Sequence, residues 1–179
     1  MNVSADIKNW LVEIVNRNLK AFATSDDDLS ITDRIEHTID TGTNVPFKER
    51  GRPVPYGARE FLEKEIAKYL KLGIISPADP GQCPYTSSVV VVPKKDGTYR
   101  MCVDYRRLNT QTVKDNYNLP RIDEIFVALH DKKHFISMDL LMGYHQVRVS
   151  AADRAKTAFS THMGLFQFNV MPFGLCNAP

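Results

Sequence analysis

One carboxylate in this chain of 179 residues stands where a metal ligand would be expected. Asp139 lies near the end of the apolar run 134–140, which has the length of a strand. A carboxylate among apolar residues is costly to bury unless it is paired or bound to a metal. Because magnesium in proteins takes one or two carboxylates plus phosphate and water, Asp139 is a candidate for metal-assisted phosphoryl transfer. The alternative is an ordinary aspartate that caps a turn.

A cluster of positive charge is the second chemical feature. Within fourteen positions the chain carries two acids, Asp96 and Asp104, and five basic residues: Lys94, Lys95, Arg100, Arg106 and Arg107. The turn-forming residues 95–97 separate two β-rich runs, 86–94 and 98–105, which predicts a hairpin with a basic tip. Cations on a mobile flap of this kind could bind a triphosphate, and the alternative is a solvated turn.

Two helices are expected before this hairpin. Apolar residues recur at helical spacing from Ser4, a suitable N-cap, to residue 22, and a second stripe covers residues 61–70 and ends at Gly73. We interpret both stripes as faces that pack into a core. Residues 42–55 carry prolines and glycines without hydrophobic periodicity, so we expect an extended connector there.

The second half of the chain alternates predicted helix and strand. Pro120 begins a helix that leads into the run 134–140, and further strands are expected at residues 144–149, 157–160 and 165–170. The final residues, Asn177-Ala178-Pro179, have the form of a helix opening, which suggests a chain that has been cut. The whole pattern is that of an α+β fold.

Composition places the chain among ordinary globular domains, with 43% apolar residues and a formal net charge of +2. No apolar run is long enough to cross a bilayer and the N-terminus lacks the order of a signal peptide, so we expect an intracellular protein without a membrane partner. Cys83, Cys102 and Cys176 lack the spacing of a zinc site or a disulfide framework.

Three segments together resemble the reverse transcriptases of Ty3/Gypsy-type retrotransposons with long terminal repeats. They are VVVVPKKDGTYRMCVDYRRLN from Val89, ISMDLLMGYHQVRV from Ile136 and MPFGLCNAP from Met171, and the resemblance runs from about Leu29 to Pro179. It implies an α+β fold made of the fingers and the first part of the palm of a right-hand polymerase, truncated before the second catalytic motif.

The same resemblance divides the chain into four parts. Residues 1–44 would form an N-terminal helix and linker, and residues 45–113 the first part of the fingers. Residues 114–146 would be the first part of the palm with the catalytic strand. Residues 147–179 would return into the fingers and begin the next palm helix.

The resemblance also implies roles for individual residues. Asp139 would be the catalytic aspartate and would hold Mg²⁺, or alternatively Mn²⁺, together with the carbonyl of Leu140. Tyr144 would press against the sugar and exclude a 2′-hydroxyl. The full set of implied nucleotide-binding residues is Lys94, Arg100, Met142, Gly143, Tyr144, Phe173 and Gly174. The implied template-binding residues are Lys95, Arg106 and Arg107.

Met142 departs from the small polar residue usual at its position. We interpret Asp104 as structural and assign no histidine a catalytic role.

The implied activity is RNA-directed DNA synthesis, in which deoxynucleotides are added to a primer by two-metal phosphoryl transfer. The implied partners are a primed RNA or DNA template, deoxynucleoside triphosphates, and the remaining polymerase and ribonuclease H portions of an element-encoded polyprotein. The implied location is the cytoplasm, within a virus-like particle in the intact element. The family's second motif, a hairpin with two adjacent aspartates, has no counterpart here except Asp26-Asp27-Asp28 in an acidic linker. We therefore expect the isolated chain to be inactive.

Two other functions are compatible with parts of the sequence. The first is a non-catalytic module, derived from such a polymerase, that binds nucleic acid or another partner. The second is an aspartic protease, because Asp40-Thr41-Gly42 matches the loop in which two carboxylates share a proton. A match of three residues without apolar strands on both sides is weak, and we disfavour proteolysis.

Overall fold

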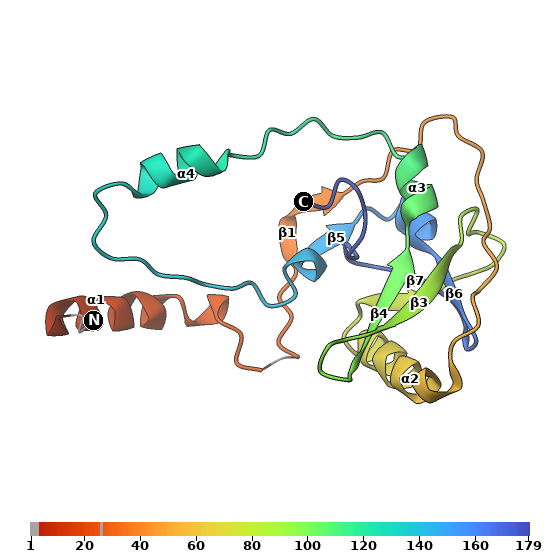
Figure 1. Ribbon diagram of the computed structural model, residues 1–179, viewed down its shortest axis with the longest axis horizontal. Coiled ribbons are helices and arrows are strands. Elements are labelled where there is room, and N and C mark those ends of the chain that lie inside the picture. The colour runs from red at the N-terminus through yellow and green to blue at the C-terminus, as the bar shows by residue number, and fades with distance from the viewer. Residues whose placement is uncertain (1–3, 26) are drawn as a thin grey trace.

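The computed structural model describes residues 4–25 and 27–179. Its centre is a five-stranded sheet with the strand order β2-β7-β6-β3-β4 (Figure 1). The strands are β2 (Ile75–Pro77), β3 (Ser87–Pro93), β4 (Tyr99–Asp104), β6 (Phe159–Thr161) and β7 (Gly164–Phe168). The neighbours β3 and β6 are parallel and the other neighbours are antiparallel. Two hairpins from distant parts of the chain therefore join into one sheet.

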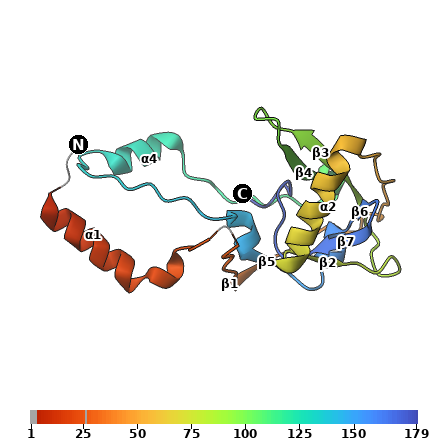
Figure 2. The same ribbon diagram turned by 90° about the horizontal axis from the view of Figure 1, so that it is seen from below.

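Helix α2 (Tyr56–Lys71) packs on this sheet (Figure 2). Its buried face and the strands form the main core, which includes Leu62, Ile66, Val89, Phe159 and Phe168. The helix ends before Gly73, which has φ +69°, and the amide of Ile74 donates to the carbonyl of Tyr69 at 2.9 Å. The predicted glycine stop and the predicted core face of this helix are both confirmed.

A smaller parallel pair of strands, β1 (Thr32–His37) and β5 (Val147–Val149), lies beside the main sheet. Helix α3 (Arg106–Gln111) follows β4, and short 3₁₀ helices occupy Leu19–Ala21, Gly143–Gln146 and Arg154–Thr157. A second core cluster joins α3 to the extended connector before α2 and consists of Ile39, Phe47, Tyr85, Tyr105, Leu108 and Leu175. This cluster and the main core together hold the body of the molecule.

An arm extends to one side of that body in both views (Figures 1 and 2). It consists of α1 (Ala5–Arg17) and of the long excursion 114–141, which contains α4 (Ile122–Leu129). The prediction that the first helix packs into a core is wrong, because α1 has no buried residue and Trp10 is among its exposed side chains. Helix α4 forms as predicted, but its apolar residues are also exposed.

The strand predicted at residues 134–140 does not form. Residues 132–140 have no regular structure and every side chain from 131 to 140 is exposed. A strand needs a hydrogen-bonded neighbour to satisfy its backbone groups, and none of the strands described in residues 4–25 and 27–179 pairs with this segment. Asp139 therefore lies on an exposed extended segment and not at the end of a buried strand.

Other differences have similar causes. Strands β1 and β2 were not predicted, and the expected strand at 144–149 is a 3₁₀ helix that leads into the short β5. The side-chain amide of Asn177 donates to the carbonyl of Val113 at 2.8 Å and accepts from the amide of Asp115 at 3.1 Å, and the helix expected to begin at this residue stays a prediction. Asp26, part of the acidic triplet, lies outside the described residues, whereas Asp27 pairs with Lys71 at 3.5 Å.

Among the described residues, no helix is both long and apolar enough to cross a membrane. Cys83, Cys102 and Cys176 are free thiols. The expected division of the chain after residues 44, 113 and 146 stays a prediction.

Candidate nucleotide site

The basic hairpin forms as predicted. Strands β3 and β4 pair in antiparallel register with Val92 opposite Arg100, and the turn between them is closed by Gly97 at φ +81°. The amide of Lys94 donates to the carbonyl of Thr98 at 2.7 Å. The hairpin projects from the sheet in Figure 2, so its exposed tip carries Lys94 and Lys95 into solvent.

A tight turn precedes the 3₁₀ helix Gly143–Gln146. Met142 adopts a left-handed backbone conformation with φ +48°, and the amide of His145 donates to its carbonyl at 2.7 Å. The side chain of Met142 packs against the main core. This explains how an apolar residue is accommodated at a position where the resemblance expects a small polar one.

Residues 144 and 173, which are far apart in the sequence, meet at this turn. The rings of Tyr144 and Phe173 lie edge to face, with centroids 4.8 Å apart and an interplanar angle of 78°. Gly174 follows with φ +95°, and a Cβ at this position would lie 3.8 Å from the carbonyl oxygen of Val103 on β4. The Pro172–Gly174 turn is therefore seated between the sheet and the Gly143–Gln146 helix.

A cavity of about 440 Å³ opens beside this turn. It is lined by β4 residues 100–103, by Phe173 and Gly174 of the turn, and by aromatic side chains behind them: Tyr69, His145 and Phe168. The arrangement combines a guanidinium group with aromatic surface, which suits a ligand that carries phosphate and a planar ring. Arg100, Phe173 and Gly174, all predicted to bind nucleotide, therefore share one cavity.

Asp139 and Leu140 do not line this cavity. The Asp139 carboxylate is exposed and has no ion pair or hydrogen bond with the described part of the chain, and the Leu140 side chain packs close to Gly143. No group of three acidic, histidine or cysteine side chains that could hold a metal occurs within residues 4–25 and 27–179. Asp139 and the carbonyl of Leu140 offer two oxygen donors, which fits part of a magnesium shell only.

Two of the expected template-binding arginines are engaged within the chain. The guanidinium of Arg106 donates to Asp104 at 2.6 and 2.8 Å, and Arg52 donates to the same carboxylate at 2.9 Å. The guanidinium of Arg107 lies 4.4 Å from the ring centroid of Phe47. Arg106 is nevertheless largely exposed, so its outer face is open to solvent. A template-binding role for Lys95, Arg106 and Arg107 stays a prediction.

The structural role of Asp104 predicts how the stability of the fold depends on pH. Its side chain is 11% exposed, and the hydrogen bond from Arg106, aided by the positive charges of Arg106 and Arg52, lowers its pKa to about 2. In the unfolded chain the pKa is about 3.9, so the contribution of this carboxylate to stability is complete above about pH 4 and is lost as the pH falls toward 2.

We therefore expect Asp104→Asn to lower the free energy of unfolding by about 1–2 kcal/mol at pH 7 and by almost nothing near pH 2. Urea denaturation followed by circular dichroism at several pH values measures this difference. Asp123→Asn, which removes only an exposed contact to Arg121 at 3.5 Å, is the control. A pH-independent loss of stability in Asp104→Asn would contradict the assignment.

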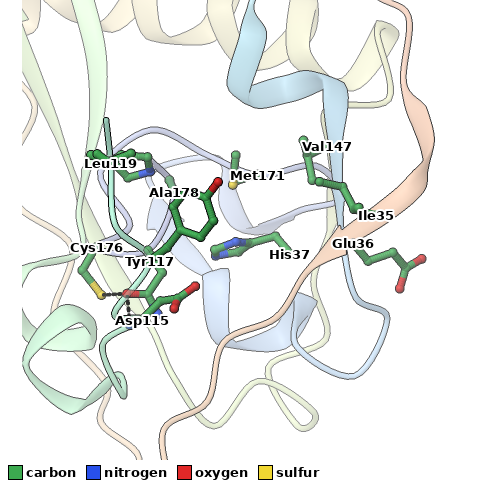
Figure 3. Close-up of a pocket in the computed structure, with 12 residues that line it drawn as sticks. Ile35, Glu36, His37, Asp115, Tyr117, Leu119, Val147, Met171, Cys176 and Ala178 are labelled. Carbon is green, nitrogen blue, oxygen red and sulfur yellow. Dashed lines mark hydrogen bonds between the residues drawn. The ribbon is translucent and has the colours of Figure 1, made fainter. Parts of the chain in front are cut away.

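A second cavity, of about 380 Å³, lies between β1, β5 and the C-terminal residues (Figure 3). The ring of His37 points into it, opposite Tyr117, and burial lowers the pKa of His37. Its lining contains none of the residues predicted to bind nucleotide or metal. This cavity is therefore separate from the candidate site.

Asp40-Thr41-Gly42 forms a local turn. The amide of Gly42 donates to the Asp40 carboxylate at 2.8 Å, and the Tyr85 hydroxyl donates to the Thr41 hydroxyl at 3.1 Å. The Asp40 carbonyl accepts from the amide of Val113 at 2.8 Å. This geometry is that of an Asx turn that ties the connector to α3, which supports the rejection of a protease.

The fold and the site define a class of protein. Residues 92–179 match the family described as reverse transcriptase (RNA-dependent DNA polymerase). The crystal structure of a prototype foamy virus protease-reverse transcriptase mutant superposes with a TM-score of 0.84 at 22% identity, covering 100% of this chain and 24% of that one. The foamy virus enzyme in complex with an RNA/DNA hybrid gives a TM-score of 0.80 at 20% identity, covering 99% of this chain and 24% of the other. The chain has the fold of part of the fingers and palm of a reverse transcriptase.

Relatives in transposons narrow this class. The Pol polyprotein of transposon gypsy from Drosophila melanogaster is 36% identical over 98% of this chain and 17% of that protein. The corresponding polyprotein of transposon opus from the same organism is 38% identical over 84% of this chain and 15% of its own length. The Tf2-3 polyprotein of Schizosaccharomyces pombe is 37% identical over 78% of this chain and 10% of its own length. The chain belongs to the reverse transcriptase family of retrotransposon Pol polyproteins and corresponds to a small part of their length.

Proposed function

We propose that the protein to which this chain belongs is an RNA-directed DNA polymerase that extends a primer with deoxynucleotides. The observation that supports this most is the meeting of Tyr144 and Phe173 beside the cavity that Arg100 lines. These residues come from three separate sequence motifs. Their meeting at one place in the fold supports a shared role in binding a nucleotide.

Each side chain then has a distinct task. Arg100, with Lys94 at the hairpin tip, binds the triphosphate, for which a planar guanidinium and a flexible ammonium are suited. The amides of Met142 and Gly143 lie toward the phosphates, and the ring of Tyr144 closes the site against a 2′-hydroxyl. Phe173 and Gly174 form the wall that faces the incoming base.

Asp139 and the carbonyl of Leu140 would hold Mg²⁺, or Mn²⁺, in the polymerase. A divalent ion there would neutralise charge on the triphosphate and stabilise the oxygens that attack and leave. The chain offers one carboxylate at this position, so we propose that it does not catalyse nucleotide transfer by itself. The exposure of Asp139 leaves its carboxylate available for such an ion.

The proposed partners are a primed template and deoxynucleoside triphosphates. Solved structures of foamy virus enzymes that share this fold are complexes with an RNA/DNA hybrid and with double-stranded DNA. Lys95, Arg106 and Arg107 would neutralise template phosphates, which makes binding sensitive to salt. We further propose an intracellular location and association with the remaining polymerase and ribonuclease H portions of the polyprotein.

A non-catalytic nucleic-acid-binding module is the second candidate. It is favoured by one observation: the described residues contain no group of three acidic, histidine or cysteine side chains that could hold a metal, whereas the basic hairpin is fully formed. Such a module would bind a template with the salt dependence of phosphate contacts, and its affinity would not depend on Asp139 or on nucleotides.

Replacing Arg100 by Ala separates these two functions. In the polymerase that contains this segment, we expect the KM for deoxynucleotides to rise about tenfold to a hundredfold, because a charge-assisted contact to phosphate is lost. Arg100→Lys keeps the charge and should recover part of the loss. Steady-state primer extension on a homopolymer template measures both.

The control is Arg34→Ala, which removes an exposed arginine of β1. If Arg100→Ala leaves the KM for nucleotides unchanged and weakens only template affinity, the binding module is favoured over the polymerase.

A further inference from the structure

The Pro172–Gly174 turn is held by two side chains that are not among the predicted site residues. The first is Asn109 of α3. Its Nδ2 donates to the carbonyl of Gly174 at 2.7 Å, and its Oδ1 accepts from the amide of Cys176 at 2.9 Å. Because both ends of the amide are used, the side chain fixes the position and the direction of the backbone that it contacts.

The second side chain is His145, which is 2% exposed. Its Nδ1 lies 3.0 Å from the carbonyl of Met171, directly before the turn. A carbonyl only accepts hydrogen bonds, so Nδ1 carries the proton. The imidazole is therefore fixed in one tautomer by the segment that leads into the turn.

Aromatic contacts surround the His145 ring. Its centroid lies 5.4 Å from Phe173 and 5.8 Å from Tyr69, in both cases edge to face, and 6.2 Å from Phe168. The charged groups that face it are Glu65 of α2 and, across the cavity, Arg100 of β4. Burial lowers the pKa of His145, so the ring is neutral at physiological pH.

These contacts decide where Phe173 sits. Its side chain is 56% exposed, so the ring is held mainly by its contacts with Tyr144 and His145. The backbone of the turn is fixed by Asn109 on one side and by His145 on the other. A shift of this turn would change the distance between Phe173 and Tyr144, the two aromatic walls of the candidate site.

We propose that His145 and Asn109 are positioning residues that hold Phe173 against Tyr144 and thereby set the selection of deoxynucleotides over ribonucleotides. Neither residue touches the nucleotide in this proposal. The proposed selection of deoxynucleotides rests on the polymerase function proposed above. The proposed role of His145 and Asn109 in holding the turn does not depend on that function. The two parts are therefore tested separately.

The structural part is tested on the 179-residue chain. Asn109→Asp keeps the size and the acceptor of the side chain but replaces its donor with a carboxylate oxygen that faces the Gly174 carbonyl. His145→Leu keeps an apolar side chain but loses the hydrogen bond to Met171. Nuclear magnetic resonance then reports the ring contact between Tyr144 and Phe173 and the hydrogen exchange of the Cys176 amide.

We expect both variants to lose the ring contact. In Asn109→Asp, repulsion between the new carboxylate oxygen and the Gly174 carbonyl should move the side chain away from the Cys176 amide, so exchange of this amide should be about tenfold faster, as expected when a hydrogen bond is weakened. Two matched variants should keep the contact. His145→Asn places an amide donor near the position of Nδ1, and Thr110→Ala removes a hydrogen bond from Thr110 to Arg107 within α3 that does not reach the turn. An unchanged ring contact in Asn109→Asp and His145→Leu overturns the proposal.

The functional part is tested in the polymerase that contains this segment. Asn109→Asp and His145→Leu should lower the discrimination between deoxynucleotides and ribonucleotides about tenfold through KM, with kcat for deoxynucleotides changed less. His145→Asn should recover most of the discrimination, which a general loss of stability would not allow. If the ring contact is lost but discrimination is unchanged, the selection role is refuted. If the wild-type polymerase extends no primer, the proposed function fails, and the clamp on the turn is judged by the ring contact alone.

Discussion

Asp139→Asn should abolish magnesium-dependent primer extension by the polymerase that contains this segment, lowering kcat on the order of a thousandfold or more. The substitution removes the charge with which the side chain would bind a divalent ion and changes little else. Template affinity should stay near normal, because it depends on basic residues and on salt and not on this acid. Single-turnover extension of a labelled primer, together with a filter-binding titration of the same duplex, measures both quantities.

The exposure of Asp139 allows this test to separate an effect on catalysis from an effect on stability. Its carboxylate is exposed and forms no hydrogen bond or ion pair with the described residues, so the substitution should not change the thermal midpoint of unfolding. The matched control is Asp131→Asn in the same arm. Asp131 is also exposed and has φ +62°, a conformation that asparagine tolerates well. Extension retained by Asp139→Asn, or lost equally in Asp131→Asn, would refute the role of Asp139.

Local chemistry explains which parts of the fold the sequence predicted. The β3–β4 hairpin is specified by Gly97 at the turn and by β-rich runs on both sides, so its signal lies within about twenty residues. The end of α2 is specified by Gly73 alone, since this residue accepts the left-handed conformation that stops a helix. Neither feature depends on what the rest of the chain does.

The incorrect predictions share a dependence on distant partners. An apolar stripe shows that a helix could pack, but not that a surface is present to receive it, and α1 has none among the described residues. The run 134–140 has strand composition, but none of the strands in the described part of the chain pairs with it. Strand β1 is the reverse case: its mostly exposed residues give little signal, and only pairing with β5 makes it a strand.

The candidate site shows the same division. The resemblance identified Tyr144 and Phe173, and the structure added that their rings are in contact. Asn109 and His145 carried no separate signal, because an asparagine in a short helix and a histidine beside a turn have many ordinary roles. Their significance comes only from hydrogen bonds to residues 171–176, which no local pattern can reveal.

The largest effect on stability is expected at Asp153, which holds the segment after β1 to the body. Its carboxylate accepts from the amide of Ile39 at 3.0 Å and from the ammonium of Lys156 at 2.8 Å, and Lys156 also donates to the carbonyl of Ile39 at 2.5 Å. The residue is 9% exposed. Four polar groups, namely the carboxylate, the ammonium, and the amide and carbonyl of Ile39, thus satisfy one another in a largely buried place.

Asp153→Ala should therefore lower the free energy of unfolding by about 3 kcal/mol, because it leaves the Ile39 amide without its acceptor and the Lys156 ammonium without its negatively charged partner. That loss is a large fraction of the roughly 5–15 kcal/mol that stabilises a typical domain. Asp153→Asn, which can still accept from the Ile39 amide, should lower the free energy of unfolding by less.

The control is Asp79→Ala, which removes an exposed aspartate. Its carboxylate accepts within its own loop, from Gly81 at 2.8 Å and Gln82 at 3.2 Å. Urea denaturation of the 179-residue chain ranks the three variants, and an Asp153→Ala protein as stable as Asp79→Ala would show that this network contributes nothing to the fold.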